Sequence, residues 1–247
     1  MQRHRHLMPR LHVDAPLAAG THLALPAAAA HHAVRALRLQ IDDAVILFNG
    51  SGGEYAARIE SIGRGGVAVR IESYSATERE SPLAVTLLQG LSSGERMDLT
   101  VQKSVELGVH AIQPVAAEKS VVRLSGERAA ARCEHWRRVA IAACEQCGRN
   151  RVPDILAPLP LARYAAPPDA LKLVLAPDAG TGLKQALSGK AAAIVLAVGP
   201  EAGFSEAEQR LLAAAGFQPV ALGPRILRTE TAAPAALAAL NALAGDF

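Results

Sequence analysis

The stretch Val198–Gly203 reads Val-Gly-Pro-Glu-Ala-Gly, and a second stretch, Leu222–Ala232, reads Leu-Gly-Pro-Arg-Ile-Leu-Arg-Thr-Glu-Thr-Ala. Each comes at the end of a run of strand-forming residues, at 193–198 and at 218–222. A Gly-Pro pair cannot continue a strand, because proline lacks the backbone donor and glycine favours unusual dihedral angles. Both stretches are therefore predicted to form loops that begin where a strand ends.

A helix is predicted after each loop. Ser205 and Glu208 have the spacing of a capping box, and Thr231 is predicted to cap the last helix, with Pro234 in its first turn. Loops at the carboxyl ends of successive strands are where open α/β sheets bind ligands. These loops carry charge beside small residues, at Glu201, Arg225, Arg228 and Glu230. The sequence thus predicts a ligand site here; the alternative is a pair of ordinary turns.

The same alternation extends back to residue 83. Apolar runs predict strands at 83–91, 110–116, 171–176, 193–198 and 218–222, and helical spacing predicts helices at 96–107 and 127–147. Alternating strands and helices indicate an α/β fold with a mostly parallel sheet that helices cover on both faces. We assign residues 83–247 to this second domain.

Residues 1–75 have a different pattern. Short runs of Val, Ile, Phe and Tyr at 44–49, 54–61 and 66–74 are separated by glycine-rich turns, which predicts a β-rich meander or small barrel. A helical turn within 27–39 would place Arg35 and Arg38 on one side. Residues 75–82 are polar, end in a proline and are predicted to be a linker.

Composition narrows the class of protein. The 247 residues are 50% hydrophobic, and no apolar run approaches membrane-span length, so we expect a soluble, cytoplasmic protein without a membrane partner. Neither a Walker A motif nor a strand followed by G-x-G-x-x-G occurs, which argues against nucleoside triphosphatases and ordinary dinucleotide folds. The three cysteines are predicted to be buried or half-buried core residues, and no metal site is predicted.

Positive charge gathers early in the chain. Residues 1–38 hold five arginines against Asp14, and residues 119–151 hold eight Lys or Arg against three glutamates. This distribution favours a polyanion partner, although a solvated basic surface explains charge alone equally well.

Four blocks of sequence resemble one family. They are Gln102–Val109 (Gln-Lys-Ser-Val-Glu-Leu-Gly-Val), Glu145-Gln146 with Arg149 and Val152-Pro153, Gly199–Phe204, and Leu222–Ala232. Together they resemble the RsmE family of 16S rRNA uracil-N3 methyltransferases in the SPOUT superfamily. Two departures are visible: Ala202 stands where the family usually has glycine, and Ser92-Ser93-Gly94 lacks the family's lysine, which puts one phosphate contact in doubt.

The resemblance implies a PUA-like β-barrel domain in residues 1–75 and a SPOUT domain whose carboxyl-terminal segment forms a trefoil knot. It also implies a homodimer that acts on 16S rRNA of the small ribosomal subunit and binds S-adenosyl-L-methionine in the knot loops. The residues expected to bind this cofactor are Val198, Gly199, Pro200, Glu201, Gly203, Leu222, Gly223, Ile226, Leu227, Thr231 and Ala232.

Methylation of N3 places negative charge on O2 and O4 of the uracil as its proton leaves, so a nearby cation should help. Arg228 is the predicted catalytic residue; the alternative is a salt bridge to Glu230 or Glu201 that braces the loop. Glu230 is a candidate for the general base, but the sequence leaves the base unassigned. The residues expected to bind RNA are Arg10, His31, Arg35, Arg38, Lys103, Lys119 and Arg123.

Two other functions compete with this hypothesis. A related SPOUT enzyme would methylate the ribose 2′-oxygen of RNA, and a non-catalytic RNA-binding assembly protein would keep the knot as a scaffold. Both remain open from sequence.

Overall fold

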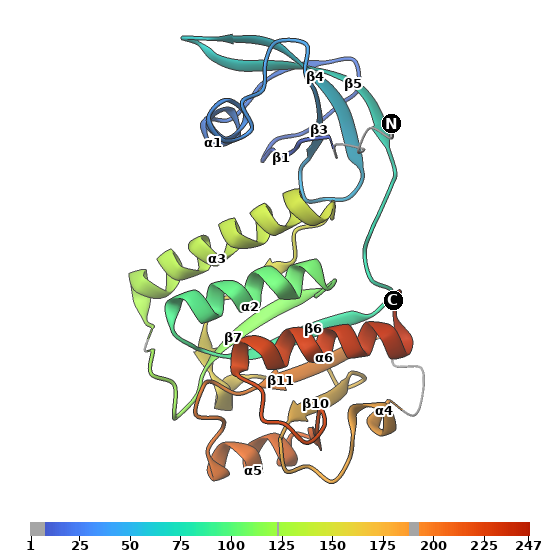
Figure 1. The fold of residues 1–247 in the computed structure, drawn as a ribbon. Coiled ribbons are helices and arrows are strands. Elements are labelled where there is room, and N and C mark those ends of the chain that lie inside the picture. The colour runs from blue at the N-terminus through green and yellow to red at the C-terminus, as the bar shows by residue number, and fades with distance from the viewer. Residues whose placement is uncertain (1–7, 123, 188–192) are drawn as a thin grey trace. The chain divides into compact units, whose positions relative to one another are not determined.

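The computed structural model describes residues 8–122, 124–187 and 193–247, which fold as two units (Figure 1). Unit 1 consists of Met1–Glu80 with Cys144–Val152, and unit 2 consists of Ser81–Ala143 with Pro153–Phe247. The segment 144–152 lies beyond the first domain that the sequence predicted, yet it belongs to unit 1. The long helix α3 (Gly126–Cys147) therefore begins in unit 2 and ends in unit 1.

Unit 1 is built on a five-stranded sheet with the order β1-β3-β4-β5-β2. The predicted meander is confirmed as β3 (Ala44–Phe48), β4 (Glu54–Gly63) and β5 (Gly66–Ser75), which pair antiparallel. The sequence missed the two outer strands, β1 (Arg10–His12) and β2 (His22–Ala24). The core of the unit is aliphatic and contains Leu11, Val13, Val45, Leu47, Ile59, Val69 and Ile71.

The helical segment of unit 1 lies within the predicted range 27–39 and ends at Ala36. Helix α1 (Ala27–His31) continues into one π-helical turn, η1 (His32–Ala36), and the chain then leaves the helix. Arg38 has a φ of 54°, which lies outside the helical region. The prediction that Arg35 and Arg38 share one helix side is therefore wrong, although both side chains are exposed.

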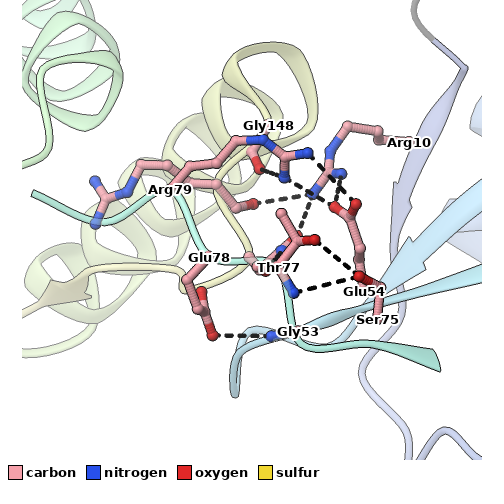
Figure 2. Close-up of polar contacts among 10 residues, drawn as sticks. Arg10, Gly53, Glu54, Ser75, Thr77, Glu78, Arg79 and Gly148 are labelled. Carbon is pink, nitrogen blue, oxygen red and sulfur yellow. Dashed lines mark hydrogen bonds and ion pairs between the residues drawn. The ribbon is translucent and has the colours of Figure 1, made fainter.

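The predicted linker is fixed by polar contacts (Figure 2). Arg79 donates to Glu54 Oε2 at 2.9 Å and to the Gly148 carbonyl at 3.0 Å, while Glu78 accepts from the Gly53 backbone N–H at 2.9 Å. Arg149, nearly buried, pairs with Glu80. These contacts join residues 77–80 and 144–152 to the sheet of unit 1.

Arg10 belongs to the same network. Its side chain is buried, lies 2.7 Å from Glu54 Oε2, donates to the Arg149 carbonyl at 3.2 Å and lies over the Phe48 ring. The prediction that Arg10 binds RNA is not supported by this position, because a buried, paired guanidinium cannot reach a phosphate. Burial opposes ionisation of Glu54, but hydrogen bonds from Arg79 and Arg10 outweigh it and lower its pKa from 4.5 to about 2.

Unit 2 contains the predicted parallel sheet, with the order β12-β10-β11-β6-β7-β8 and β9 also on β7. Every pairing in this sheet is parallel, among the residues that the structure describes. The strands are β6 (Ala84–Gly90), β7 (Ala111–Ala116), β8 (Asp154–Ile155), β9 (Leu159–Pro160), β10 (Leu171–Leu175), β11 (Ala193–Val198) and β12 (Gln218–Val220). The expectation of a mostly parallel sheet is confirmed.

Helices cover both faces of this sheet (Figure 1). On one face α6 (Thr229–Ala244) packs against β6, β11 and α2 (Gly94–Glu106), and α4 (Leu183–Ala186) packs on α6. On the other face α5 (Glu206–Ala214) and η2 (Leu161–Arg163) bury Leu212, Phe217 and Leu161 against Leu88, Val195 and Ala197. Alternate residues of each strand point to opposite faces, which is why these continuous apolar runs serve both layers.

One predicted helix start is confirmed and one is wrong. Ser205 caps α5, with reciprocal hydrogen bonds to Glu208 of 3.2 and 2.8 Å. Helix α6, however, begins at Thr229, so Thr231 lies exposed in its first turn instead of capping it. Pro234 is consequently in the second turn.

The cysteines are core or half-buried residues, as predicted. Burial raises the pKa of the Cys144 thiol to about 12. The described residues contain no cluster of three or more metal-ligating side chains, and no helix among them is long and apolar enough to span a membrane.

Candidate functional site

A cavity of about 810 Å³ opens at the carboxyl ends of β10, β11 and β12. The two loops that the sequence singled out, after β11 and after β12, line it together, as predicted. Of the residues predicted to bind a cofactor, all line the cavity except Thr231: Val198, Gly199, Pro200, Glu201, Gly203, Leu222, Gly223, Ile226, Leu227 and Ala232. The exposed position of Thr231 follows from the earlier start of α6.

Glycines let the loops approach each other and the sheet. A Cβ added at Gly90, the last residue of β6, would lie 2.4 Å from the backbone nitrogen of Pro200. A Cβ at Gly199 would lie 3.0 Å from the Cα of Gly203. Gly203 itself has a φ of +69°, which side chains rarely adopt. The turn after β11 therefore depends on the absence of side chains at these positions.

Thr229 ties the second loop to the first. Its buried hydroxyl donates to the Gly199 carbonyl at 2.8 Å and accepts from Gln89 Nε2 at 3.0 Å. These bonds hold the start of α6 at the ends of β11 and β6. The sequence prediction missed this residue, because Thr-Glu-Thr offers two hydroxyls at a helix start and local pattern does not distinguish them.

Glu201 lines the cavity, but its carboxylate is held by the start of α2. Oε1 accepts from the Ser93 backbone N–H at 2.9 Å and from Arg96 Nη1 at 3.0 Å. Burial acts to raise the pKa of Glu201, but the hydrogen bonds from Ser93 and Arg96 outweigh it, so its pKa lies below the usual value. The ionised Glu201 carboxylate thus anchors the first loop to the start of α2.

A second, smaller cavity of about 170 Å³ lies beside the Glu201–Arg96 ion pair. Arg96, Glu201, Arg228, Thr229 and Glu230 line it, and Glu201 and Thr229 line the larger cavity as well. Arg96 lies 3.7 Å from Glu230 Oε1, whereas Glu230 Oε2 is buried without a hydrogen-bond partner. Arg228 is exposed and forms no ion pair within the described ranges, so the salt bridge considered as its alternative role is absent there.

Sequence reasoning overlooked the third wall of the larger cavity. Leu175–Asp178, at the end of β10, and the buried rings of Phe204 and Phe217 line it. The signal was available, since 171–176 was predicted to be a strand in the same parallel sheet and its carboxyl end had to lie at the same edge.

The residues predicted to bind RNA have different surroundings. His31, Arg35 and Arg38 are exposed in unit 1. In unit 2, Lys103 is half-exposed and pairs with Glu106 at 2.9 Å, and exposed Lys119 lines the larger cavity. Arg123 lies outside the described residues.

Two family descriptions match the chain. Residues 79–241 match an RNA methyltransferase domain, and residues 25–72 match an RNA methyltransferase PUA domain. The first covers the sheet of unit 2 with both loops of the cavity, and the second covers β3, β4 and most of β5.

Similar proteins extend over nearly the whole chain. The ribosomal RNA small subunit methyltransferase E of Buchnera aphidicola subsp. Acyrthosiphon pisum is 31% identical over 97% of this chain and 95% of its own. A crystal structure of the protein of that name from Neisseria gonorrhoeae, bound to S-adenosyl methionine, is 41% identical, with a TM-score of 0.91 over 98% of this chain and 100% of that one. A putative methyltransferase from Legionella pneumophila, in complex with the same cofactor, is 39% identical, with a TM-score of 0.93 and the same coverage.

Proposed function

The chain belongs to the ribosomal RNA small subunit methyltransferase E family, and we propose that it transfers the methyl group of S-adenosylmethionine to N3 of one uridine in 16S ribosomal RNA. The observation that carries this proposal is the pair of adjoining cavities. A larger one, rich in backbone and apolar groups, shares Glu201 and Thr229 with a smaller one that holds Arg228.

The larger cavity fits the cofactor. Its volume of about 810 Å³ lies within the roughly 300–1,000 Å³ of small-molecule sites. Backbone groups of Val198, Gly199 and Leu222 would form hydrogen bonds with the edge of the adenine. The side chains of Leu227 and Ala232 would pack against its ring. When bound, S-adenosylmethionine supplies a methyl group on a positively charged sulfur. Thr229 bonds the second loop to the first, and Glu201 bonds the first loop to the start of α2, so both loops are held in place beside the cavity.

A trefoil knot of the SPOUT type accounts for the path of the second loop. The loop leaves β12 at one edge of the sheet and reaches Thr229, which bonds Gly199 after β11 and Gln89 of β6. It therefore crosses the end of β10, which lies between β12 and β11. We extend the proposal to a PUA-like barrel for unit 1.

Arg228 is the catalytic residue in this proposal. It faces the smaller cavity, and Arg96 rather than Arg228 neutralises Glu201 and Glu230. A guanidinium without a carboxylate partner can donate to a carbonyl oxygen of a uracil, where negative charge grows as the N3 proton leaves. The exposed side chains of His31, Arg35, Arg38 and Lys119 and the half-exposed Lys103 would hold RNA phosphates. A cytoplasmic homodimer on the small ribosomal subunit completes the proposal.

The identity of the methylated nucleoside tests this function. The purified protein is incubated with small-subunit RNA or subunits lacking the modification and with isotope-labelled S-adenosylmethionine, and the nucleosides are then separated by mass spectrometry. We expect labelled N3-methyluridine. A labelled 2′-O-methyl nucleoside would assign the protein to ribose methylation, and no labelled nucleoside from either substrate would favour a non-catalytic RNA-binding protein.

A further inference from the structure

The unpartnered carboxylate oxygen of Glu230 is the feature of the active region that the proposed function leaves unexplained. Oε2 is buried and has no hydrogen-bond partner, while the side chain as a whole is 13% exposed. A buried charged oxygen without a donor is costly, and such groups in folded proteins usually await a ligand or serve chemistry. The smaller cavity that Glu230 lines is where such a donor would enter.

Arg96 lies beside one oxygen of this carboxylate. Its Nη1 is bonded to Glu201 at 3.0 Å, and its Nε lies 3.7 Å from Glu230 Oε1. One oxygen of Glu230 therefore faces a cation that is already held in place, and the other remains available. Arg228 lines the same cavity and offers a second guanidinium there.

A carboxylate oxygen beside a guanidinium complements one particular pattern of hydrogen-bonding groups, a donor flanked by acceptors. The imide edge of uracil carries this pattern, with N3–H between O2 and O4. The cytosine ring presents an acceptor at N3, which a carboxylate oxygen would repel. The chemistry of the cavity thus selects a uracil ring over a cytosine ring.

Resting on the function proposed above, we infer that Glu230 recognises the N3–H of the target uridine and accepts its proton during methyl transfer. In this step the N3–H bond breaks, the proton passes to Oε2, and N3 forms a bond to the methyl carbon as the carbon–sulfur bond of the sulfonium breaks. The sulfur leaves as a neutral thioether. Arg228 balances the charge that grows on the uracil oxygens, and Glu230 then returns its proton to water.

A different role for Glu230 must be separated from this one. It is the second residue of α6, where a negative charge is favourable in any helix. Glu95 occupies the same position in α2 and is exposed. Glu95→Gln is therefore the matched control for Glu230→Gln, because both remove one charge from the second position of a helix.

The test measures single-turnover methylation of two RNAs, one with uridine and one with the more acidic 5-fluorouridine at the target position. We expect Glu230→Gln to slow the reaction of uridine about 100-fold, to change the calorimetric affinity for S-adenosylmethionine less than threefold, and to slow the 5-fluorouridine reaction less than tenfold. Glu95→Gln should slow neither. An equal loss on both RNAs, or a parallel loss of cofactor affinity, would overturn the inference.

A second measurement needs no variant, so it stands even if Glu230→Gln fails to fold. Wild-type protein should bind RNA carrying 3-deazauridine, which has C–H in place of N3–H, about tenfold more weakly than the uridine RNA. Equal binding of the two RNAs would overturn the inference. If wild-type protein produces no N3-methyluridine at all, the proposed function itself fails; if it does, these results bear on Glu230 alone.

Discussion

Arg228 differs from its neighbour in the smaller cavity in having no carboxylate partner in the described parts of the chain. Arg96 is occupied by Glu201 and Glu230, so each arginine has a distinct task. A cation held ready for charge that develops only during the reaction should affect the rate more than binding.

We therefore expect Arg228→Ala to lower turnover by about 100-fold or more while the affinity for S-adenosylmethionine changes little. The turnover of Arg228→Lys should lie between those of wild type and Arg228→Ala, because lysine keeps the positive charge but loses the planar guanidinium. Single-turnover kinetics and calorimetry measure the two quantities. A parallel fall in both after Arg228→Ala would make Arg228 a cofactor-binding or folding residue.

Thr229 and Thr231 offer a matched pair of substitutions. Thr229→Val removes a buried hydroxyl that serves both Gln89 and Gly199, so it should destabilise the protein by about 1–3 kcal/mol and weaken cofactor binding. Thr231→Val changes an exposed residue and should stay within about 0.5 kcal/mol of wild type. Urea unfolding measures the difference; equal effects would show that the Thr229 hydroxyl has no special role.

At the scale of single residues, sequence reasoning identified both loops that line the larger cavity but misplaced two side chains. It put Thr231 at the cap because a hydroxyl before an Ala/Leu helix is a good local signal, and only the packing of Thr229 on Gly199 shows where the helix begins. It assigned Arg10 to RNA binding because the partners that bury Arg10 could not be foreseen. These partners, Glu54 and Asn150, lie 44 and 140 residues away in sequence.

Among the elements, the turn after β11 depends most on its surroundings. Gly90→Ala would bring a methyl group within 2.4 Å of Pro200, so the turn has to move. Gly94, at the start of α2, has no atom within 4 Å of an added Cβ.

Gly90→Ala should therefore weaken S-adenosylmethionine binding by about tenfold or more, a loss of roughly 1.4 kcal/mol, whereas Gly94→Ala should leave it unchanged. Calorimetry compares the two variants, and circular dichroism confirms that both are folded. Wild-type affinity in Gly90→Ala would show that the close approach of β6 to the turn does not shape the cavity.

Long elements were predicted well, and most of the shortest strands were not, although the three-residue β12 was found within the predicted range 218–222. Helix α3 and strand β11 match their predicted ranges within a residue, because many positions contribute to the helical period or the apolar run. Strands β1 and β2 have three residues each and β8 and β9 have two, too few for any period to emerge. These strands owe their existence to pairing with β3, β5 and β7.

On the scale of the whole molecule, ion pairs close unit 1 by holding its distant chain segments against its sheet. Arg10 and Arg79 pair with Glu54 (Figure 2). Arg149 pairs with Glu80 where residues 77–80 and 144–152 join the sheet. The boundary of the unit could not be predicted, since a polar segment ending in proline is typical of a free linker and its partners come from the end of a distant helix.

This closure predicts a pH dependence. The pKa of Glu54 is lowered from 4.5 to about 2, so its stabilising contribution is present above pH 4.5 and is lost as the pH falls toward 2. We expect Glu54→Gln to remove on the order of 2 kcal/mol of stability at pH 7 and to flatten the acid dependence in that window. Urea unfolding at several pH values checks this; an unchanged acid profile would contradict it.

RNA binding by exposed cations predicts a salt dependence. Lys119→Ala should weaken RNA binding and reduce the slope of log K against log salt by about one. Lys184, also exposed, is absent from the predicted set, so Lys184→Ala should leave the slope unchanged. Fluorescence titrations at several salt concentrations compare the two. Equal slopes would remove Lys119 from the RNA-binding surface.

The central claim is that the methyl donor lies between the loops that follow β11 and β12. A crystal structure with S-adenosylmethionine at saturating concentration tests it most directly. The account predicts electron density for the whole ligand in the larger cavity, beside Gly199, Leu222 and Ala232, with its methyl group directed toward Arg228 and Glu230. Density at another place, or side chains filling the cavity while the ligand is bound elsewhere, would contradict it.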